Sequence, residues 1–305
     1  MSPVATNQTI SYLSRRFADV GIRLNARHGQ NFLIDLNLQR LLVERARLQA
    51  TDVVLEVGTG TGALTAIMSP LVAAVVTVEI DPRLYQLASE ELFGLTNVVQ
   101  LGHDALKNKS NFDPRLLAAV GQQLAGGTGR RLKLVANLPF SVATPVIANL
   151  LASAIVPESM TVTIQKEMAD RVAAKPGSKD YSALSVWIQS QCRVELVRTL
   201  PPSVFWPRPK VTSAIVHIDV DDELRGRIPD LQFFHDFVRS LFYHRRKFLR
   251  SVLQSALKGR LEKPAVDRLL AETGLNPESR ADQLDVPTLQ RLSETVRAEL
   301  TATAG

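Results

Sequence analysis

The sequence from Asp52 to Gly62, Asp-Val-Val-Leu-Glu-Val-Gly-Thr-Gly-Thr-Gly, contains the pattern that decides the fold. Its first six residues are mostly apolar and β-branched, which is typical of a buried strand. Three glycines follow at alternate positions, and a helical spacing of apolar residues begins over 61–71. Glycines let the backbone turn sharply and approach a ligand, so a strand that passes through them into a helix indicates a nucleotide-binding α/β sheet.

Short apolar runs and helical stretches alternate on both sides of this segment. Helical spacing precedes it over 38–48, and further strands are predicted over the ranges 74–80, 98–101, 132–136, 160–164 and 214–220. Apolar strands that alternate with helices predict a parallel sheet covered on both faces. The glycine-rich stretch 121–131 is expected to form a flexible loop before the fourth strand.

The character of the sequence changes near Asp219. Residues 220–226 are polar and linker-like, and no strand pattern follows them. Three helices are predicted instead, over the ranges 233–257, 263–273 and 287–300, with glycine and proline between them. We therefore expect a first domain over 1–221 and a small all-helical domain over 222–305.

The first domain begins with an extension of about 1–25 that is rich in arginine. Residues 10–20 within it have the amphipathic spacing of a surface helix. An arginine-rich transit peptide is the alternative, but no apolar region or cleavage-like signal follows. We favour the surface helix.

The composition narrows the classes of function. The chain has 305 residues and is 45% hydrophobic, which suits two domains with a substantial core, and no run of 18 or more apolar residues predicts a membrane span. Cys192 is the only cysteine, and the five histidines lack zinc-type spacing, so we expect no disulfide, no metal and a cytoplasmic location. The net charge of +6 is compatible with a polyanionic partner such as nucleic acid, and no heptad pattern calls for a second subunit, so we expect a monomer.

Glu79 closes the second predicted strand, and Asp104 lies just past the third. Glu79 lies about 20 positions after Gly58, where a carboxylate accepts a hydrogen bond from a ribose hydroxyl, so an adenosine-type ligand is predicted. The glycines also fit the dinucleotide pattern of a nicotinamide-dependent oxidoreductase, and such turns occur without a ligand. Asp104 favours S-adenosylmethionine, because a carboxylate there can accept the exocyclic amine of adenine. Taken alone, Asp104 fits a helix cap or turn better.

The fourth predicted strand runs directly into Asn137-Leu138-Pro139-Phe140. An exocyclic amine on an aromatic ring is a poor nucleophile, because its lone pair is delocalised. The Asn137 side-chain oxygen and the Leu138 carbonyl are acceptors that can orient such an amine, and Pro139 stiffens the turn that carries them. Phe140 offers a face for base stacking, worth about 1–3 kcal/mol. The structural alternative is an ordinary turn with a core phenylalanine.

With these residues in place, the chain resembles the ribosomal RNA adenine N6-dimethyltransferase family, which acts on small-subunit rRNA. The resemblance extends over roughly residues 20–295 and follows the order of the family's motifs. The further segments that carry it are His28–Leu33 (HGQNFL), Gln165–Glu167 with Arg171, Ser178–Val186 (SKDYSALSV), Pro201–Ala214 (PPSVFWPRPKVTSA), Phe242–Leu249 (FYHRRKFL) and Arg280–Leu284 (RADQL).

The resemblance implies a Rossmann-like class I methyltransferase sheet with a small C-terminal all-helical domain. It implies N6-dimethylation of two adjacent adenosines in a hairpin near the 3′ end of 16S rRNA, in an immature 30S particle during ribosome biogenesis, with S-adenosylmethionine as methyl donor. The cofactor contacts that it implies are Asn31, Leu33, Gly58, Glu79, Asp104 and Asn137. Its catalytic motif corresponds to Asn137, Leu138, Pro139 and Phe140. Phe140 stands where the bacterial pattern has tyrosine, and it keeps the stacking face. Ser141 and Ala143 also depart from the pattern, and these two departures leave open which contacts the rim of the site makes to the RNA.

Basic residues in the predicted helix 233–257 are candidates for gripping RNA phosphates, above all Arg245, Arg246 and Lys247. Arg239 and Arg250 add charge to the same helix, and we expect its aromatic residues Phe242, Tyr243 and Phe248 to form a core stripe. A second basic edge is predicted from Lys166, Arg171, Lys175 and Lys179. The alternative functions are adenine N6-methylation of large-subunit rRNA and ribosome assembly with a minor catalytic role.

Overall fold

A computed structural model describes residues 10–19, 21 and 31–304. His28, Gly29 and Gln30 of the predicted motif and most of the extension 1–25 lie outside these residues. The chain divides into two compact units, the first of Met1–Ala169 with Val194–Asp219 and the second of Asp170–Arg193 with Val220–Gly305. Residues 170–193 thus belong to the second unit, whereas the predicted division placed them in the first domain.

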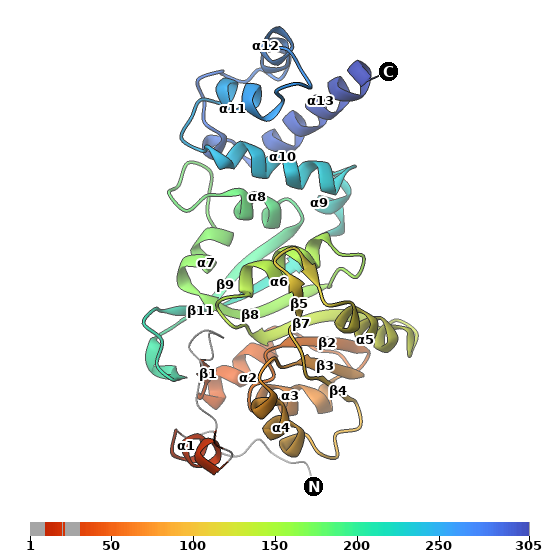
Figure 1. The fold of residues 1–305 in the computed structure, drawn as a ribbon, viewed down its shortest axis with the longest axis vertical. Helices are drawn as coiled ribbons and strands as arrows, with labels where there is room; N and C mark the ends of the chain where they lie inside the picture. Colours follow the sequence, from red (N-terminus) through yellow and green to blue (C-terminus); the bar gives the residue numbers. More distant parts are fainter. Residues whose placement is uncertain (1–9, 20, 22–30, 305) are drawn as a thin grey trace. The chain divides into compact units, whose positions relative to one another are not determined.

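The first unit is built around a seven-stranded sheet (Figure 1). Its strands, in spatial order, are β4 (Val98–Leu101), β3 (Ala74–Val78), β2 (Asp52–Val57), β7 (Arg131–Asn137), β8 (Ser159–Gln165), β11 (Ser213–Val220) and β9 (Cys192–Leu200). The first five pair in parallel, as predicted, and β11 pairs antiparallel to β8. β9 was not predicted, because its burial is mixed and its charged residues hide the apolar pattern.

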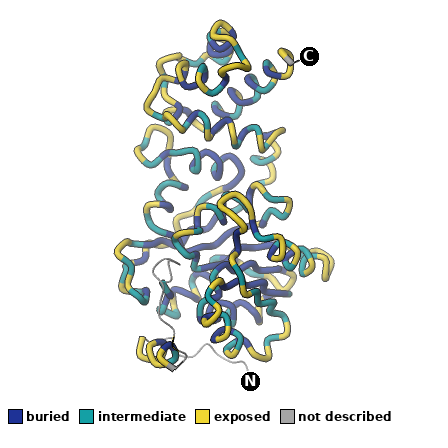
Figure 2. Tube along the Cα trace, viewed as in Figure 1, coloured by how far each residue is buried: buried dark blue, intermediate teal, exposed yellow. Residues whose placement is uncertain are grey.

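Helices cover both faces of this sheet. All six residues of β2 are buried, and the central strands are the most buried part of the unit (Figure 2). Helices α2 (Leu36–Arg45) and α3 (Ala63–Met68) share one apolar cluster with Val54, Val75 and Val135. The short helix η2 (Ser69–Leu71) continues α3. Helix α5 (Pro114–Ala125) packs against β2, β3 and β7.

Helix α5 corrects the expected loop over 121–131. The Asp113 side chain caps the helix by accepting the backbone N–H of Arg115, and Leu116 and Val120 are buried. The helix therefore continues through Gly121 to Ala125, and only the remainder of the predicted loop lies outside it. A buried helical face outweighed the weak helix propensity of glycine.

The order of the strands places the ends of β2, β3 and β7 at one edge of the sheet. The chain passes from β2 to β3 on one side and later returns to β7 on the other, so the connections diverge next to β2. Ligands bind at such a switch point in open α/β sheets. Gly58 and Asn137 lie there, and Glu79 follows β3.

The remaining elements of this part of the chain are α4 (Pro82–Glu91), β5 (Leu106–Asn108), β6 (Asn111–Phe112), α6 (Ala143–Ala152), α7 (Lys166–Val172) and η3 (Pro202–Val204).

A small two-stranded sheet joins two of the family-like segments. β1 (Phe32–Leu33) pairs antiparallel with β10 (Phe205–Trp206). Helix α1 (Ile10–Asp19) confirms the predicted surface helix over its described residues, and its buried Phe17 contacts the rings of Phe32 and Trp206 at centroid distances of 5.4 Å.

The second unit is helical, as predicted. Its helices are α8 (Ala183–Gln189), α9 (Asp222–Gly226), α10 (Leu231–Tyr243), α11 (Leu249–Ala256), α12 (Lys263–Glu272), η4 (Ala281–Gln283) and α13 (Val286–Ala304). The linker expected over 220–226 contains α9, which begins because the Asp221 side chain caps it. Over the described residues, none of the helices combines the length and apolar character needed to cross a bilayer.

The single helix predicted over 233–257 is wrong. Helix α10 ends at Tyr243 and α11 begins at Leu249. Between them the chain turns, and the Leu249 N–H donates to the Ser279 carbonyl at 2.7 Å while Phe248 forms a β-bridge with Arg280. The predicted basic cluster therefore lies in a turn between two helices.

Candidate functional site

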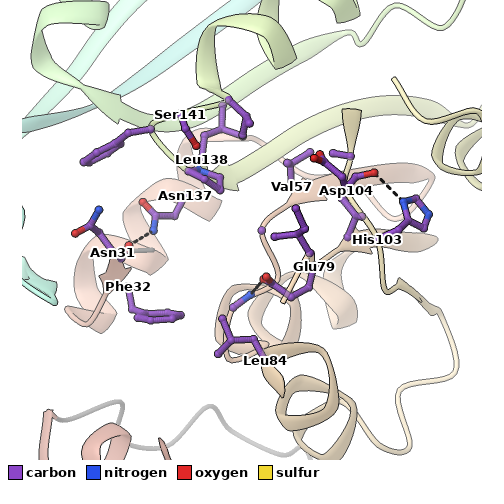
Figure 3. A pocket seen from close by; sticks show the side chains of 18 residues that line it. Asn31, Phe32, Val57, Glu79, Leu84, His103, Asp104, Asn137, Leu138 and Ser141 are labelled. Carbon is purple, nitrogen blue, oxygen red and sulfur yellow. Dashed lines mark hydrogen bonds between the residues drawn. The ribbon is translucent and has the colours of Figure 1, made fainter. Parts of the chain in front are cut away.

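A cavity of about 240 Å³ opens at the carboxyl ends of β2, β3 and β7 (Figure 3). Its walls contain most of the residues that the sequence predicts for the site, namely Asn31, Gly58, Glu79, Asp104, Asn137, Leu138, Pro139 and Phe140. Leu33 is buried in the core and lines a smaller cavity beside it. The structure thus brings together side chains from segments that lie more than a hundred residues apart.

Two other parts of the site, at Phe32 and at Pro139, pack closely against the glycine loop of residues 58–62. Gly58 and Gly60 have φ values of +90° and +58°, which favour glycine. A Cβ atom on Gly58 would lie 3.2 Å from the ring of Pro139, and one on Gly60 would lie 3.1 Å from the ring of Phe32. The loop, β1 and the predicted acceptor motif therefore form one tightly packed wall of the cavity.

Glu79 is held by backbone donors at the end of β3. Its Oε2 accepts the N–H of Gly60 at 2.9 Å and its Oε1 accepts the N–H of Asp81 at 3.0 Å. The side chain is buried, and this burial raises the pKa of the carboxyl group, while the backbone hydrogen bonds oppose the rise. Each carboxylate oxygen has a further lone pair, so the group can accept hydroxyl donors from the cavity.

Asp104 is a turn residue that also lies in the wall of the cavity. Its Oδ1 accepts the N–H of Leu106 at 2.9 Å, as a turn residue does, and the residue also lines the cavity. His103 lies beside it, with Nδ1 2.8 Å from the backbone oxygen of Asp104. The His103 Nε2 is buried and has no hydrogen-bond partner among the described residues. This end of the cavity therefore has polar side chains, including a ring nitrogen to which no described residue is hydrogen-bonded.

Asn137 is fixed in one orientation at the other end of the cavity. Its Nδ2 donates to the backbone oxygen of Asn31 at 2.8 Å, which assigns the two ends of the amide (Figure 3). The Oδ1 is then left buried without a hydrogen-bond partner within the described part of the chain. A buried acceptor without a partner costs about 1–3 kcal/mol, so this atom is poised for an N–H donor.

Hydrogen bonds also hold the turn that follows Asn137. The Leu138 N–H donates to the Thr163 carbonyl at 3.2 Å, and the Val142 N–H donates to the Pro139 carbonyl at 3.0 Å. Ser141 and Val142 line the cavity together with Phe140. The departure from the family pattern at Ser141 thus falls in the wall of the cavity itself.

The buried carboxyl group of Glu56 lies beneath the glycine loop, and no role was predicted for it. The Glu56 Oε2 accepts the hydroxyls of Thr65 and Thr77, the latter at 2.7 Å, and the Thr77 hydroxyl lies 2.6 Å from that of Thr59. Burial raises the pKa of Glu56 to about 8, although both hydroxyl bonds lower it. Glu56 therefore carries a proton at neutral pH and links the loop to β3 and α3.

Several wall residues were missed in the sequence. Phe32, His103 and the apolar residues Val57, Ile80 and Leu84 line the cavity without having been assigned to it individually. Gln39 lines the smaller cavity, and a signal for it existed, because this polar residue stands on the buried face of α2. Over residues 10–19, 21 and 31–304, no three His, Cys, Asp or Glu side chains form a group that could hold a metal ion.

The basic residues predicted to bind RNA in the second unit have three kinds of surroundings. The Arg245 guanidinium donates to the carbonyls of Lys179 and Tyr181 at 2.9 and 3.2 Å, so it anchors the loop 178–182. Arg246 and Lys247 are exposed in the turn. Arg250 forms a two-bond ion pair with Asp267 on α12.

The expected aromatic core stripe is only partly correct. Phe242 packs its ring edge-on against Tyr181 at a centroid distance of 5.9 Å. Tyr243 and Phe248 are instead 82% and 51% exposed, because the chain leaves the helical path between them. In the predicted second basic edge, Lys175 and Lys179 are exposed residues of the second unit, whereas Lys166 belongs to the first unit.

Two solved structures share the fold of this chain. The crystal structure of a dimethyladenosine transferase from Plasmodium falciparum matches with a TM-score of 0.72 and 23% identity, over 88% of this chain and 97% of that chain. The crystal structure of the 23S rRNA methyltransferase ErmE matches with a TM-score of 0.62 and 23% identity, over 87% and 99%. At these identities the likeness concerns the fold alone, and it confirms the expected class I methyltransferase sheet.

Sequence comparison identifies the family. The family described as ribosomal RNA adenine dimethylase matches residues 21–291. The chain is 37% identical to a ribosomal RNA small subunit methyltransferase A of Halothermothrix orenii, over 97% of this chain and 93% of the relative. It is 34% identical to a protein of the same name from Clostridium acetobutylicum, over 90% and 94%. The activity is therefore S-adenosylmethionine-dependent methylation of adenine in ribosomal RNA, and the chain belongs to the ribosomal RNA adenine dimethylase family.

Proposed function

We propose that this enzyme dimethylates N6 of two adjacent adenosines in a hairpin near the 3′ end of small-subunit rRNA, within an immature 30S particle in the cytoplasm. The observation that carries the proposal is the buried, unpartnered Oδ1 of Asn137, which lines the same cavity as the glycine loop. The curated relatives named above are small-subunit enzymes, which favours this substrate over large-subunit rRNA.

The cavity fits S-adenosylmethionine by the chemistry of its walls. Glu79 has acceptor capacity for ribose hydroxyls, and Asp104 has it for the exocyclic amine of adenine. Gly58 leaves space that a Cβ would fill, and Asn31, Leu33 and Asn137 complete the set of proposed cofactor contacts. When bound, S-adenosylmethionine supplies an electrophilic methyl group on a sulfonium.

The chain's own contribution to the reaction is to orient the amine. The Asn137 Oδ1 accepts one amine N–H, and the Leu138 carbonyl accepts the other, which turns the nitrogen lone pair out of conjugation with the base. The Nδ2 bond to Asn31 prevents the Asn137 amide from rotating. Pro139 holds the turn, and Phe140 stacks on the base. Positioning of this kind suits two successive transfers, because the monomethylated nitrogen retains one N–H for Asn137.

The second unit is the proposed RNA-binding region. Arg246 and Lys247 are exposed in the α10–α11 turn and neutralise phosphates, while Arg245 supports the turn from within. The exposed Tyr243 and Phe248 flank these cations and offer faces to unpaired bases. We propose that the protein acts as a monomer, without a metal, and that the RNA-binding role belongs to residues 222–305.

The test is transfer of labelled methyl groups to immature small subunits, followed by nucleoside analysis. The intact enzyme is expected to form N6-dimethyladenosine, and Asn137→Ala is expected to lower the rate by about 100-fold or more, since positioning is lost. Thermal unfolding of Asn137→Ala serves as the control for folding, and rates are compared at saturating S-adenosylmethionine because Asn137 is also a proposed cofactor contact. Tight binding to immature subunits without any methyl transfer by the intact protein would favour the assembly-factor alternative.

A further inference from the structure

A second cavity, of about 50 Å³, lies beside the one described above. The two cavities share Phe32, Gly58, Gly60 and Asn137 in their walls. The larger cavity extends from Asn137 to Glu79 and Asp104. The smaller one extends toward the helix α2. The other residues of its wall are Leu33, Gln39, Leu42, Glu56, Thr59, Thr61, Ala63 and Leu64.

Gln39 is a buried amide in the wall of this smaller cavity. Its side chain is 4% exposed, and Leu38, Leu42 and Val43 of the same helix are buried with it. The Nε2 donates to the backbone oxygen of Leu33 at 2.5 Å. Because a carbonyl can only accept, this bond assigns the orientation of the amide. The Oε1 is then buried with no hydrogen-bond partner among the described residues.

The unpartnered Oε1 of Gln39 requires a hydrogen-bond donor, and the residues around it indicate the kind of donor. A buried acceptor is costly unless an N–H or O–H group reaches it. Leu42, Leu64 and the backbone oxygen of Leu33 cannot donate, and the hydroxyls of Thr59 and Thr61 in the same wall do not hydrogen-bond to this atom. An anionic ligand group has no proton to donate to Oε1, and the partial negative charge of this oxygen would repel it. A cationic N–H donor from a ligand is the group that fits.

The proposed cofactor has a cationic N–H donor on the part of the molecule that lies beyond its sulfur, away from the adenosine. Its reactive sulfur must face the amine held at Asn137, and its adenosine part is assigned to Glu79 and Asp104. The remaining substituent is a short chain that ends in an α-ammonium and an α-carboxylate. Because Asn137 lines both cavities, that chain has the smaller cavity available to it.

We propose that Gln39 is a cofactor-binding residue whose Oε1 accepts a hydrogen bond from the α-ammonium of S-adenosylmethionine. Its Nε2 at the same time holds Leu33 in place. The proposal rests on the proposed function only in so far as that function assigns the adenosine and sulfur ends of the cofactor to the larger cavity.

Equilibrium binding of three ligands to the Gln39→Met variant tests the proposal. Methionine is close to glutamine in length and shape but removes the acceptor. The affinity for S-adenosylhomocysteine should fall on the order of 10-fold or more, as expected for losing a hydrogen bond to a charged group. Decarboxylated S-adenosylmethionine, which keeps the ammonium, should lose as much. 5′-Methylthioadenosine, which lacks the whole amino-acid part, should bind within about twofold of the unmodified protein.

Gln100→Met is the matched control. The Gln100 Nε2 also donates to a backbone carbonyl, that of Tyr85 at 2.9 Å, but the residue lines neither cavity. It should leave the affinity for all three ligands unchanged. If Gln39→Met does not fold by thermal unfolding, Gln39→Leu replaces it with the same expected pattern.

Two results would overturn the inference. One is an unchanged affinity for S-adenosylhomocysteine in the Gln39 variants, which would leave Oε1 to a water molecule. The other is an equal loss for 5′-methylthioadenosine, which would reduce Gln39 to a support for Leu33. If the unmodified protein binds none of the ligands, the cofactor assignment of the proposed function fails as well, so the two failures are distinguishable.

Discussion

Because Gly58 has no side chain, the glycine loop can pack directly against Pro139 of the segment Asn137–Phe140. A Cβ there would lie 3.2 Å from Pro139, and the φ of +90° adds backbone strain to any substitution. We expect Gly58→Ala to weaken binding of S-adenosylhomocysteine by about 10-fold or more, because loop and proline would have to separate. Calorimetric titration measures this.

Gly94 supplies the control for that substitution. Its φ is also +90°, but a Cβ on it would meet nothing within 4 Å. Gly94→Ala should therefore show the strain of a positive φ, about 1–2 kcal/mol of unfolding free energy, with cofactor affinity unchanged. Equal binding losses in the two variants would mean that the contact with Pro139 is unimportant.

The raised pKa of Glu56 should make the free energy of unfolding depend on pH. Its pKa is raised by burial from 4.5 to about 8 in the folded protein, so the folded state binds more protons than the unfolded state between these values. The contribution of Glu56 is therefore fully present below about pH 4.5 and is lost as pH rises through about 8. We expect a loss on the order of 4 kcal/mol across this window.

Denaturant unfolding between about pH 5 and pH 8 checks this expectation. Gln in place of Glu56 keeps an oxygen for Thr65 and Thr77 but cannot ionise. The Glu56→Gln variant should therefore show a flatter dependence of unfolding free energy on pH than the unmodified protein. Parallel pH profiles for the two proteins would show that Glu56 does not hold a proton.

Residue roles could be predicted where a motif fixes the position along the chain. Gly58 and Asn137 directly follow predicted strands, Glu79 and Asp104 follow the next two strands closely, and all four line the cavity. The proposed role of Gln39 depends on a hydrogen bond to Leu33, which the sequence does not show, although a polar residue on the apolar face of a helix was a signal for it.

At the scale of elements, one side chain helps to anchor the turn between α10 and α11. The guanidinium of Arg245 bonds to two carbonyls of the loop 178–182. Arg245→Gln should lower the unfolding free energy by about 1–3 kcal/mol, because a hydrogen-bonded cation is lost there. Arg246→Gln, at an exposed position, should change it by less than about 0.5 kcal/mol. Chemical denaturation measures both, and similar values would contradict an anchoring role for Arg245.

The same turn explains why one helix was predicted where there are two. The buried positions Phe234, Val238 and Leu241 are followed by Leu249 and Val252, which keep nearly the same helical phase across the break. Periodicity therefore passes through the turn unchanged. The break is set by backbone bonds from Phe248 and Leu249 to residues 279–280, and these are tertiary contacts.

At the scale of the whole molecule, charge should govern affinity for RNA. The net charge is +6, and Arg246 and Lys247 are exposed cations of the second unit. Replacing both with glutamate should weaken binding to immature small subunits and reduce the slope of log affinity against log salt by about 1–2. Filter binding over a salt series measures the slope. A slope equal to that of the unmodified protein would remove these residues from the RNA contact.

The architecture of the whole molecule was predictable in kind but not in detail. Alternating strands and helices predicted the parallel sheet, and the later helices predicted a helical unit. The antiparallel β11 and the assignment of 170–193 to the second unit depend on which segments pack together. Local patterns of hydrophobicity contain no information on such pairings.

The pairing of β1 with β10 has a consequence for the order of events during protein synthesis. Phe32 forms part of the cavity wall, and its strand is hydrogen-bonded to Phe205–Trp206, which leave the ribosome much later. A nascent chain that has already produced Gly58, Glu79 and Asn137 still lacks the strand that holds Phe32 in register. The enzyme therefore completes its cavity late in translation, after nearly all of the sheet has been synthesised.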